Sequence, residues 1–143
     1  MPKINFDDVP DAEDYTPVPK GRYLCRVAEV HEDVTQSGDE MWHLWLEIAQ
    51  GDHAGRFLFD NMVFSEKALK RVKLICSRLG LDVSGEIDLV PEMITDHMCW
   101  VIADVEEYED AAGQLKRRNF VPFAGYERYT ESEKSQNDDD LPF

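Results

Sequence analysis

The sequence predicts a mainly β protein, and the prediction rests on three observations. Turn residues rich in glycine, serine and aspartate separate segments in which apolar and polar residues alternate, as in strands with one buried face. Residues 65–79 instead repeat their apolar residues at helical spacing. Three strands, one helix and two further strands is the element order of an OB-fold. We therefore expect an OB-fold-like five-stranded barrel with one helix between the third and fourth strands.

The first two strands are predicted over residues 22–34 and 41–48. The first is long and mixed in character, so we expect it to bend and change face near Glu29. The second alternates closely, and its predicted core face is formed by Trp42, Leu44, Leu46 and Ile48. Trp45 is therefore predicted to be a large aromatic residue on the face directed away from the core, together with His43.

The third strand is predicted over residues 56–63, with Arg56 on the face opposite its inward side chains. The predicted inward side chains are Phe57, Phe59 and Val63. The fourth strand is predicted over residues 98–105 and the fifth over residues 115–123. The fifth begins with a run of three bases, Lys116, Arg117 and Arg118.

The helix between the third and fourth strands has clear start and stop signals. Ser65 is a suitable N-cap, and Gly80 ends the helix. The face predicted to meet the core is formed by Ala68, Leu69, Val72, Ile75, Cys76 and Leu79. The opposite face is basic, is expected to be solvated, and is formed by Lys67, Lys70, Arg71 and Arg78.

The chain of 143 residues is long enough for one domain with a single core. Residues 1–20 are rich in acids and prolines and are predicted to be an extended acidic arm. Residues 21–129 are predicted to be the OB-fold domain. Residues 130–143 combine low hydrophobicity with like charge, which predicts a disordered acidic tail.

The net charge of −15 argues against a broad nucleic-acid-binding surface. Five acids against two bases in residues 1–20 and six against two in residues 127–143 leave 19 acids and 11 bases in the remainder. Because the remainder is still acidic, any contact with nucleic acid has to come from a local basic patch.

Motifs for catalysis, metals and nucleotide cofactors are missing from the sequence. There is no CxxC or HxxxH pair, no GxxxxGK[ST] loop and no GxGxxG fingerprint, so we expect no enzyme activity, metal or cofactor. Cys25, Cys76 and Cys99 are odd in number and widely spaced, which indicates reduced core residues in the cytoplasm. No apolar run reaches the roughly 18 residues of a membrane span, and the N-terminus is unlike an export signal.

The last six residues join an acidic run to an apolar tip and a carboxylate. They are Asp138, Asp139, Asp140, Leu141, Pro142 and Phe143. Such an end suits capture by another protein, because the ring fills a pocket and the carboxylate meets a cation. The alternative is a frayed end with an incidental aromatic residue.

This end resembles the C-terminal tip of bacterial and phage single-stranded DNA-binding proteins. The rest of the chain is similar to small phage-encoded proteins considered to bind single-stranded DNA, through Gly21 and Tyr23, a Ser-Gly turn, and Gly51 and Gly55. The resemblance implies a DNA-coating protein without strong sequence preference. It also implies recruitment of replication, recombination and repair proteins by the tip, in the cytoplasm of a bacterium or phage-infected cell.

An OB-fold binds single strands on the face of its second and third strands, flanked by two loops. The residues predicted to contact DNA are Arg22, Arg26, His43, Trp45, Arg56, Lys116, Arg117, Arg118 and Phe120. Each has an alternative: Trp45 could pack in the core or at a dimer interface, and the bases could pair with nearby acids. The acidic composition keeps open a second function, an adaptor or recombination-accessory protein that binds proteins alone. The sequence leaves the oligomeric state open.

Overall fold

A computed structural model of the chain describes residues 1–3, 5 and 17–130. The predicted acidic tip and most of the predicted N-terminal arm lie outside these residues. The described part contains one α-helix, two short 3-10 helices and six strands in one antiparallel sheet. The elements are β1 (Gly21–Val34), β2 (Glu40–Ile48), β3 (Phe57–Val63), η2 (Glu66–Ala68), α1 (Leu69–Arg78), η3 (Pro91–Met93), β4 (Met98–Glu109), β5 (Leu115–Phe120) and β6 (Tyr126–Arg128). The predicted mainly β class is confirmed.

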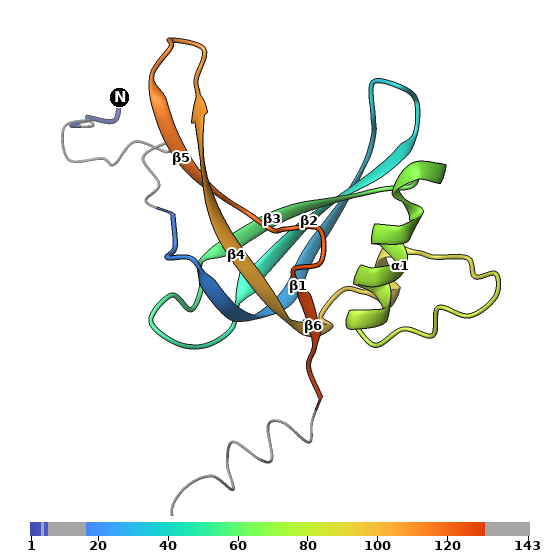
Figure 1. The fold of residues 1–143 in the computed structure, drawn as a ribbon. Helices are drawn as coiled ribbons and strands as arrows, with labels where there is room; N and C mark the ends of the chain where they lie inside the picture. The colour runs from blue at the N-terminus through green and yellow to red at the C-terminus, as the bar shows by residue number, and fades with distance from the viewer. Residues whose placement is uncertain (4, 6–16, 131–143) are drawn as a thin grey trace, which may run out of the picture.

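The strands follow the order β3-β2-β1-β4-β5, with β6 paired to β4. The predicted change of face in β1 is confirmed by an irregularity in its pairing between Val27 and Glu29. β1 pairs with β2 from Cys25 onward and with β4 from Gly21 to Arg26, so the bent strand joins both halves of the sheet. The β1–β2 and β4–β5 hairpins project to the same side of the molecule, and β3 crosses between them (Figure 1). β3 and β5, the two ends of this order, are not hydrogen-bonded to each other.

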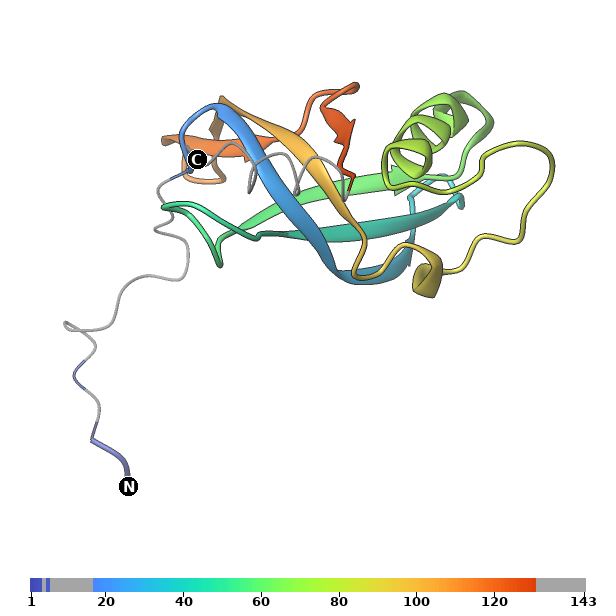
Figure 2. The same cartoon turned by 90° about the horizontal axis from the view of Figure 1, so that it is seen from below.

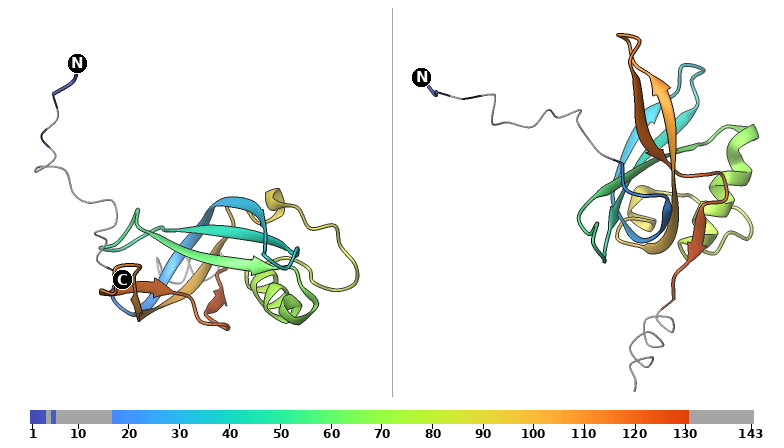
Figure 3. Two further views of the ribbon diagram at one scale, coloured as in Figure 1. Left: turned by 90° about the horizontal axis from the view of Figure 1, so that it is seen from above. Right: turned by 60° about the vertical axis from the view of Figure 1, so that its left-hand side comes forward.

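The core lies on the inner side of the curved sheet, where α1 closes one end (Figures 2 and 3). The predicted inward face of β2 is confirmed, because Trp42, Leu44, Leu46 and Ile48 are all buried. The prediction for β3 is wrong: Leu58 and Met62 are the buried residues, whereas Phe59 is 59% exposed and Phe57 36% exposed. Residues directly opposite each other on neighbouring strands share a face of the sheet. Leu58 therefore follows Leu46 inward, and Phe59 follows Trp45 outward.

The helix begins and ends where the sequence predicts. The Ser65 side chain accepts a hydrogen bond from the amide of Ala68, and Gly80 follows with a φ of +96°. Val72, Ile75, Cys76 and Leu79 are buried as expected. The inward prediction for Leu69 is wrong, because 49% of this residue is exposed. Leu69 is the first residue of α1, and the buried residues of the helix begin one turn later at Val72.

Arg71 also differs from its prediction, because it does not belong to a solvated face. Its guanidinium forms two hydrogen bonds with Asp60 of β3, at 3.1 and 2.7 Å. It also donates to the carbonyls of Asn61 (3.0 Å) and Phe123 (3.3 Å), so it ties β3 to the segment that follows β5. The buried Tyr126 donates its hydroxyl to Asp60 at 2.5 Å, and burial, followed by the nearby carboxylate, raises the pKa of this tyrosine. Side chains thus join β3 to the segment after β5 and to β6 at this end.

The segment before β1 is held against β5 by one side chain. The amide of Val18 donates to Asn119 Oδ1, and Asn119 Nδ2 donates to the carbonyl of Val18, each at 2.9 Å. Val18 is buried in the core. This anchoring brings Pro17 to the space between β3 and the β4–β5 hairpin.

The three cysteines are free thiols in the core. Burial raises the pKa of Cys25 to about 12 and that of Cys76 to about 11, and it also raises the pKa of Cys99. Cys25 and Cys99 are directly opposite each other on β1 and β4. None of the helices in residues 17–130 has the length and apolar character needed to cross a membrane.

Candidate nucleic-acid interface

Four rings gather on the outer face of β1, β2 and β3, and we call His31, Trp45, Phe57 and Phe59 the aromatic face. Trp45 is central: its ring centroid lies 4.7 Å from that of His31, 6.1 Å from that of Phe57 and 5.7 Å from that of Phe59. The Phe57 and Phe59 rings are nearly parallel, with their planes 22° apart. Trp45 is half-buried by these neighbours and is not part of the core.

The sequence places these rings together through strand register. Phe59 is opposite Trp45, and Trp45 is opposite Glu29, two positions before His31. Alternation along each strand then puts Phe57 and His31 on the same side of the sheet as Trp45. The face is consequently built from three strands, and its geometry is set by the same ladders that build the core.

His43 lies beside the aromatic face, held by two hydrogen bonds. Its Nε2 is 2.8 Å from Asp33 Oδ2, and its Nδ1 is 2.6 Å from Asn61 Oδ1. The Asp33 carboxylate, followed by the Asn61 oxygen, raises the pKa of His43, and the His43 ring in turn lowers the pKa of Asp33. An imidazolium donates from both nitrogens, so this arrangement favours the charged ring.

The raised pKa of His43 gives the sign of its contribution to stability. The contribution is complete below the unfolded value of about 6.5 and is lost as pH rises through the higher folded value. For Asp33 the contribution is present above about 3.9 and is lost as pH falls through its lowered folded pKa.

His43 should make binding of oligo-dT dependent on pH. Lowering the pH from 8 to 6 at constant ionic strength is expected to tighten binding by up to about fivefold, because one cation is added beside the aromatic face. The measurement is a fluorescence anisotropy titration at each pH. His43→Gln should abolish the His43 part of the change, whereas His53→Gln, in the loop between β2 and β3, should retain it. Equal pH dependence in His43→Gln and the parent protein would contradict the prediction.

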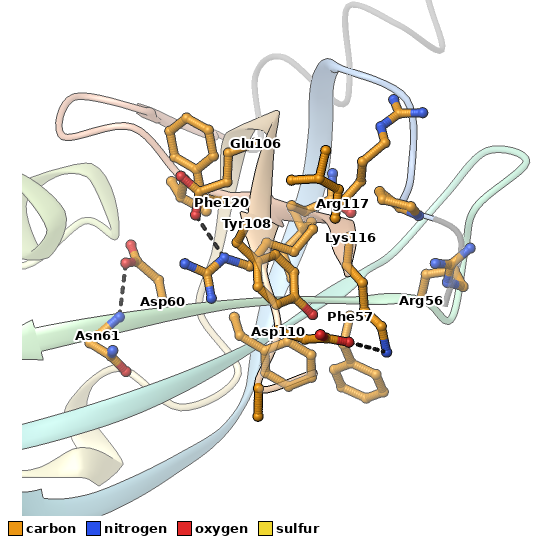
Figure 4. Close-up of a pocket in the computed structure, with 18 of the residues that line it drawn as sticks. Arg56, Phe57, Asp60, Asn61, Glu106, Tyr108, Asp110, Lys116, Arg117 and Phe120 are labelled. Carbon is orange, nitrogen blue, oxygen red and sulfur yellow. Dashed lines mark hydrogen bonds and ion pairs between the residues drawn. The ribbon is translucent and has the colours of Figure 1, made fainter. Parts of the chain in front are cut away.

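A groove of about 1860 Å³ runs between β3 and the β4–β5 hairpin (Figure 4). Phe57 and Phe59 line one wall, so the groove is continuous with the aromatic face. Tyr108 and Phe120 add rings from the hairpin. The charged residues of the lining are four bases and three acids, namely Arg56, Lys116, Arg117, Arg118, Asp60, Glu106 and Asp110. The lining therefore contains more bases than acids, whereas the chain as a whole has a net charge of −15.

The bases of the hairpin differ in how strongly acids engage them. Arg118 forms an ion pair with Glu106 at 2.7 Å, and its guanidinium lies 4.6 Å from the centroid of the Tyr108 ring. Lys116 is 3.6 Å from Asp110. Arg117 is exposed and has no ion pair within the part of the chain that the structure describes. The alternative to DNA contact, pairing with nearby acids, is thus seen for Lys116 and Arg118.

The other predicted DNA contacts are distributed unevenly. Arg56, Lys116, Arg117, Arg118 and Phe120 all line the groove, as expected of a common site. Trp45 and His43 lie on the adjoining outer face of β2.

Two predicted arginines are not brought into the groove. Arg22 forms an ion pair with Glu127 at 2.7 Å and lies 4.0 Å from the centroid of the Trp100 ring, close to β6. It is seven positions along β1 from Glu29, roughly 23 Å in an extended strand. Arg26 is held by two carboxylates, Glu47 at 2.9 Å and Asp96. Both lie before the bend in β1, and neither lines the groove.

Sequence reasoning missed four residues of this region, His31, Phe57, Phe59 and Tyr108. The signal for Phe59 was its place opposite Trp45, which requires the register of β2 and β3. His31 follows the bend in β1, and the predicted change of face near Glu29 would have placed it outward.

The described residues contain no cluster of histidine, cysteine and acidic side chains that could hold a metal ion. Comparison with protein families gives a match over residues 4–121 to a family described as a protein of unknown function, DUF669. A search of the curated proteins found no match.

Proposed function

Because the chain belongs to the DUF669 family, whose function is unknown, we propose from the site alone that it binds single-stranded DNA without strong sequence preference. The proposal includes the fold: a partly open OB-type barrel in which the groove between β3 and β5 is the opening. The element order, the bend in β1 and the helix after β3 support this assignment.

The observation that supports this function best is the position of the aromatic face at a groove whose other wall, β5, contributes Lys116, Arg117 and Arg118. Bases of any sequence stack on aromatic rings, at about 1–3 kcal/mol for each stacked base. Phe59 is more than half exposed, so its ring is accessible without rearrangement of the core. The bases of the hairpin line the same groove as Phe57 and Phe59, so a strand whose bases stack on these rings would present its phosphates to the hairpin.

Intrinsic tryptophan fluorescence provides the direct test. Oligo-dT added at low salt is expected to quench the emission of Trp45, and the apparent affinity should fall steeply as salt increases, because bound phosphates release counterions. Trp45→Phe should lose most of the quenching, since Trp42 is buried and Trp100 lies beside Arg22. Unchanged emission, with no binding detected by anisotropy, would count against the proposal.

One observation favours a second function, that of an acidic adaptor binding only proteins. Most predicted DNA-contacting bases are already paired with carboxylates: Arg22, Arg26, Lys116 and Arg118. A paired base must give up its carboxylate before it can contact a phosphate. Its contact with phosphate therefore contributes less binding energy than the same contact made by an unpaired base. Absence of oligo-dT binding at low salt would favour this function.

The C-terminal tip, Asp138–Phe143, is proposed to recruit replication, recombination or repair proteins. These residues lie outside the described part, so the proposal rests on their sequence and on the resemblance. Deleting them is expected to leave oligo-dT affinity equal or tighter, because three acids are removed, and to abolish partner capture. Anisotropy and pull-down measurements on the same deletion variant test both expectations. Weaker DNA binding by the variant would contradict the first.

A further inference from the structure

β3 is an edge strand whose residues alternate in the direction of their backbone groups. The carbonyl of Arg56 accepts from the amide of Ile48 at 2.8 Å. At the other end of the strand, the amide of Phe64 donates to the backbone carbonyl of Glu40 at 2.9 Å. In an antiparallel ladder every second residue bonds to the neighbour, so the even-numbered residues of β3 bond to β2. The odd-numbered residues therefore direct their N–H and C=O groups away from β2, toward the groove.

One end of this edge is already satisfied by side chains. The amide of Asn61 donates to Asp60 Oδ1 at 2.8 Å, and its carbonyl accepts from Arg71 at 3.0 Å. Phe57 and Phe59 have no comparable backbone partner within residues 17–130. Their two N–H and two C=O groups form an open edge, which is a template for the addition of a strand.

The facing wall of the groove has the same property. The amide of Asp110 donates to the carbonyl of Gln114 at 2.9 Å, which assigns the even-numbered residues of β5 to the ladder with β4. Leu115 and Arg117 thus direct their backbone groups outward, and both line the groove. Two strand edges therefore face one space of about 1860 Å³ (Figure 4).

The charge of the lining selects among peptides. Arg117 has no ion pair in the described part, and Arg56, Lys116 and Arg118 line the same groove. In a bound strand, every second side chain points to the same face. A peptide with acids at alternate positions would present a row of carboxylates to these bases.

We propose that this groove binds an extended acidic peptide of a partner protein, which adds as a strand to the open edge of β3 at Phe57 and Phe59. Its backbone supplies the missing hydrogen bonds, and its acids meet the bases of β5. The proposal goes beyond nucleic-acid binding and does not depend on it, since it requires backbone pairing rather than stacking.

Amide hydrogen exchange of the full chain tests the pairing directly. The probe is an acetylated, C-terminally amidated octapeptide of alternating aspartate and threonine. At saturation, exchange at the amides of Phe57 and Phe59 is expected to slow by at least about tenfold, whereas Leu58 and Asp60, already bonded to β2, should change little. Peptide binding without slowing at Phe57 and Phe59 would overturn strand addition, and so would no binding at millimolar peptide.

Charge variants test the choice of peptide. Arg117→Glu should weaken octapeptide binding by at least about fivefold, since a like charge then faces the carboxylates. Arg78→Glu is the matched control, because Arg78 is an exposed base of α1 outside the groove. A lysine–threonine octapeptide should bind weakly; equal binding would overturn the charge argument. Oligo-dT is titrated into separate, peptide-free samples of the same variants, because both ligands are proposed to occupy this groove. Failure of one proposal is then distinguished from failure of the other.

Discussion

Replacing Arg71 by alanine is expected to lower the free energy of unfolding by about 3–5 kcal/mol, the usual cost of removing one partner of a buried ion pair. The Arg71 side chain is only 18% exposed and that of Asp60 only 11% exposed. After the substitution the Asp60 carboxylate would keep the hydroxyl of Tyr126 but lose both guanidinium hydrogen bonds. The carbonyls of Asn61 and Phe123 would lose a donor as well.

Urea denaturation followed by circular dichroism measures this change. Lys70→Ala is the matched control, since Lys70 is an exposed base on the same helix and its removal should shift stability by no more than about 0.5 kcal/mol. Arg71→Lys keeps the charge but not the two-pronged geometry, so it should fall between the two. Similar stabilities of Arg71→Ala and Lys70→Ala would show that the packing of β3 against the segment after β5 does not depend on Arg71.

Phe59→Ala is expected to reduce oligo-dT affinity by about 5- to 150-fold, the equivalent of one stacked base at about 1–3 kcal/mol. Because 59% of Phe59 is exposed, the fold should lose little from the truncation. The measurement is an anisotropy titration at low salt, with unfolding followed in parallel to show that the variant remains folded.

The chain offers a close control for this substitution in Phe123. It is also a phenylalanine and is 60% exposed, but it does not line the groove. Phe123→Ala should therefore bind oligo-dT as the parent protein does. An equal loss in both variants would indicate a general effect of surface hydrophobicity, and no loss in Phe59→Ala would remove the aromatic face from the proposed interface.

The contrast between β2 and β3 explains how far the sequence could predict the site. In β2 large apolar residues alternate with His43 and Glu47, so only one face can be the core, and Trp45 was correctly placed outward. In β3 both faces contain large apolar residues. Phe57 and Phe59 lie on one face, and Leu58 and Met62 lie on the other. Local pattern cannot decide between two apolar faces, because the decision is made by register with the neighbouring strand.

Arg71 shows a second limit. Helical spacing places it next to Val72 and among other bases, which predicts a solvated position. Its role depends on Asp60, eleven residues earlier, and on carbonyls some fifty residues later. Such long-range pairing leaves no local signature. The helix boundaries, by contrast, depend on Ser65 and Gly80, which act within one turn, and they were predicted correctly.

The rate at which the three buried thiols are alkylated would report how often the folded protein opens. Alkylating reagents attack the thiolate, and both enclosure and a raised pKa keep Cys25, Cys76 and Cys99 unreactive in the folded chain. Alkylation therefore requires local or global unfolding that exposes the core. Since Cys25 and Cys99 lie on adjoining strands and Cys76 lies on the helix, mass spectrometry of labelled fragments would report whether the helix detaches before the strands separate.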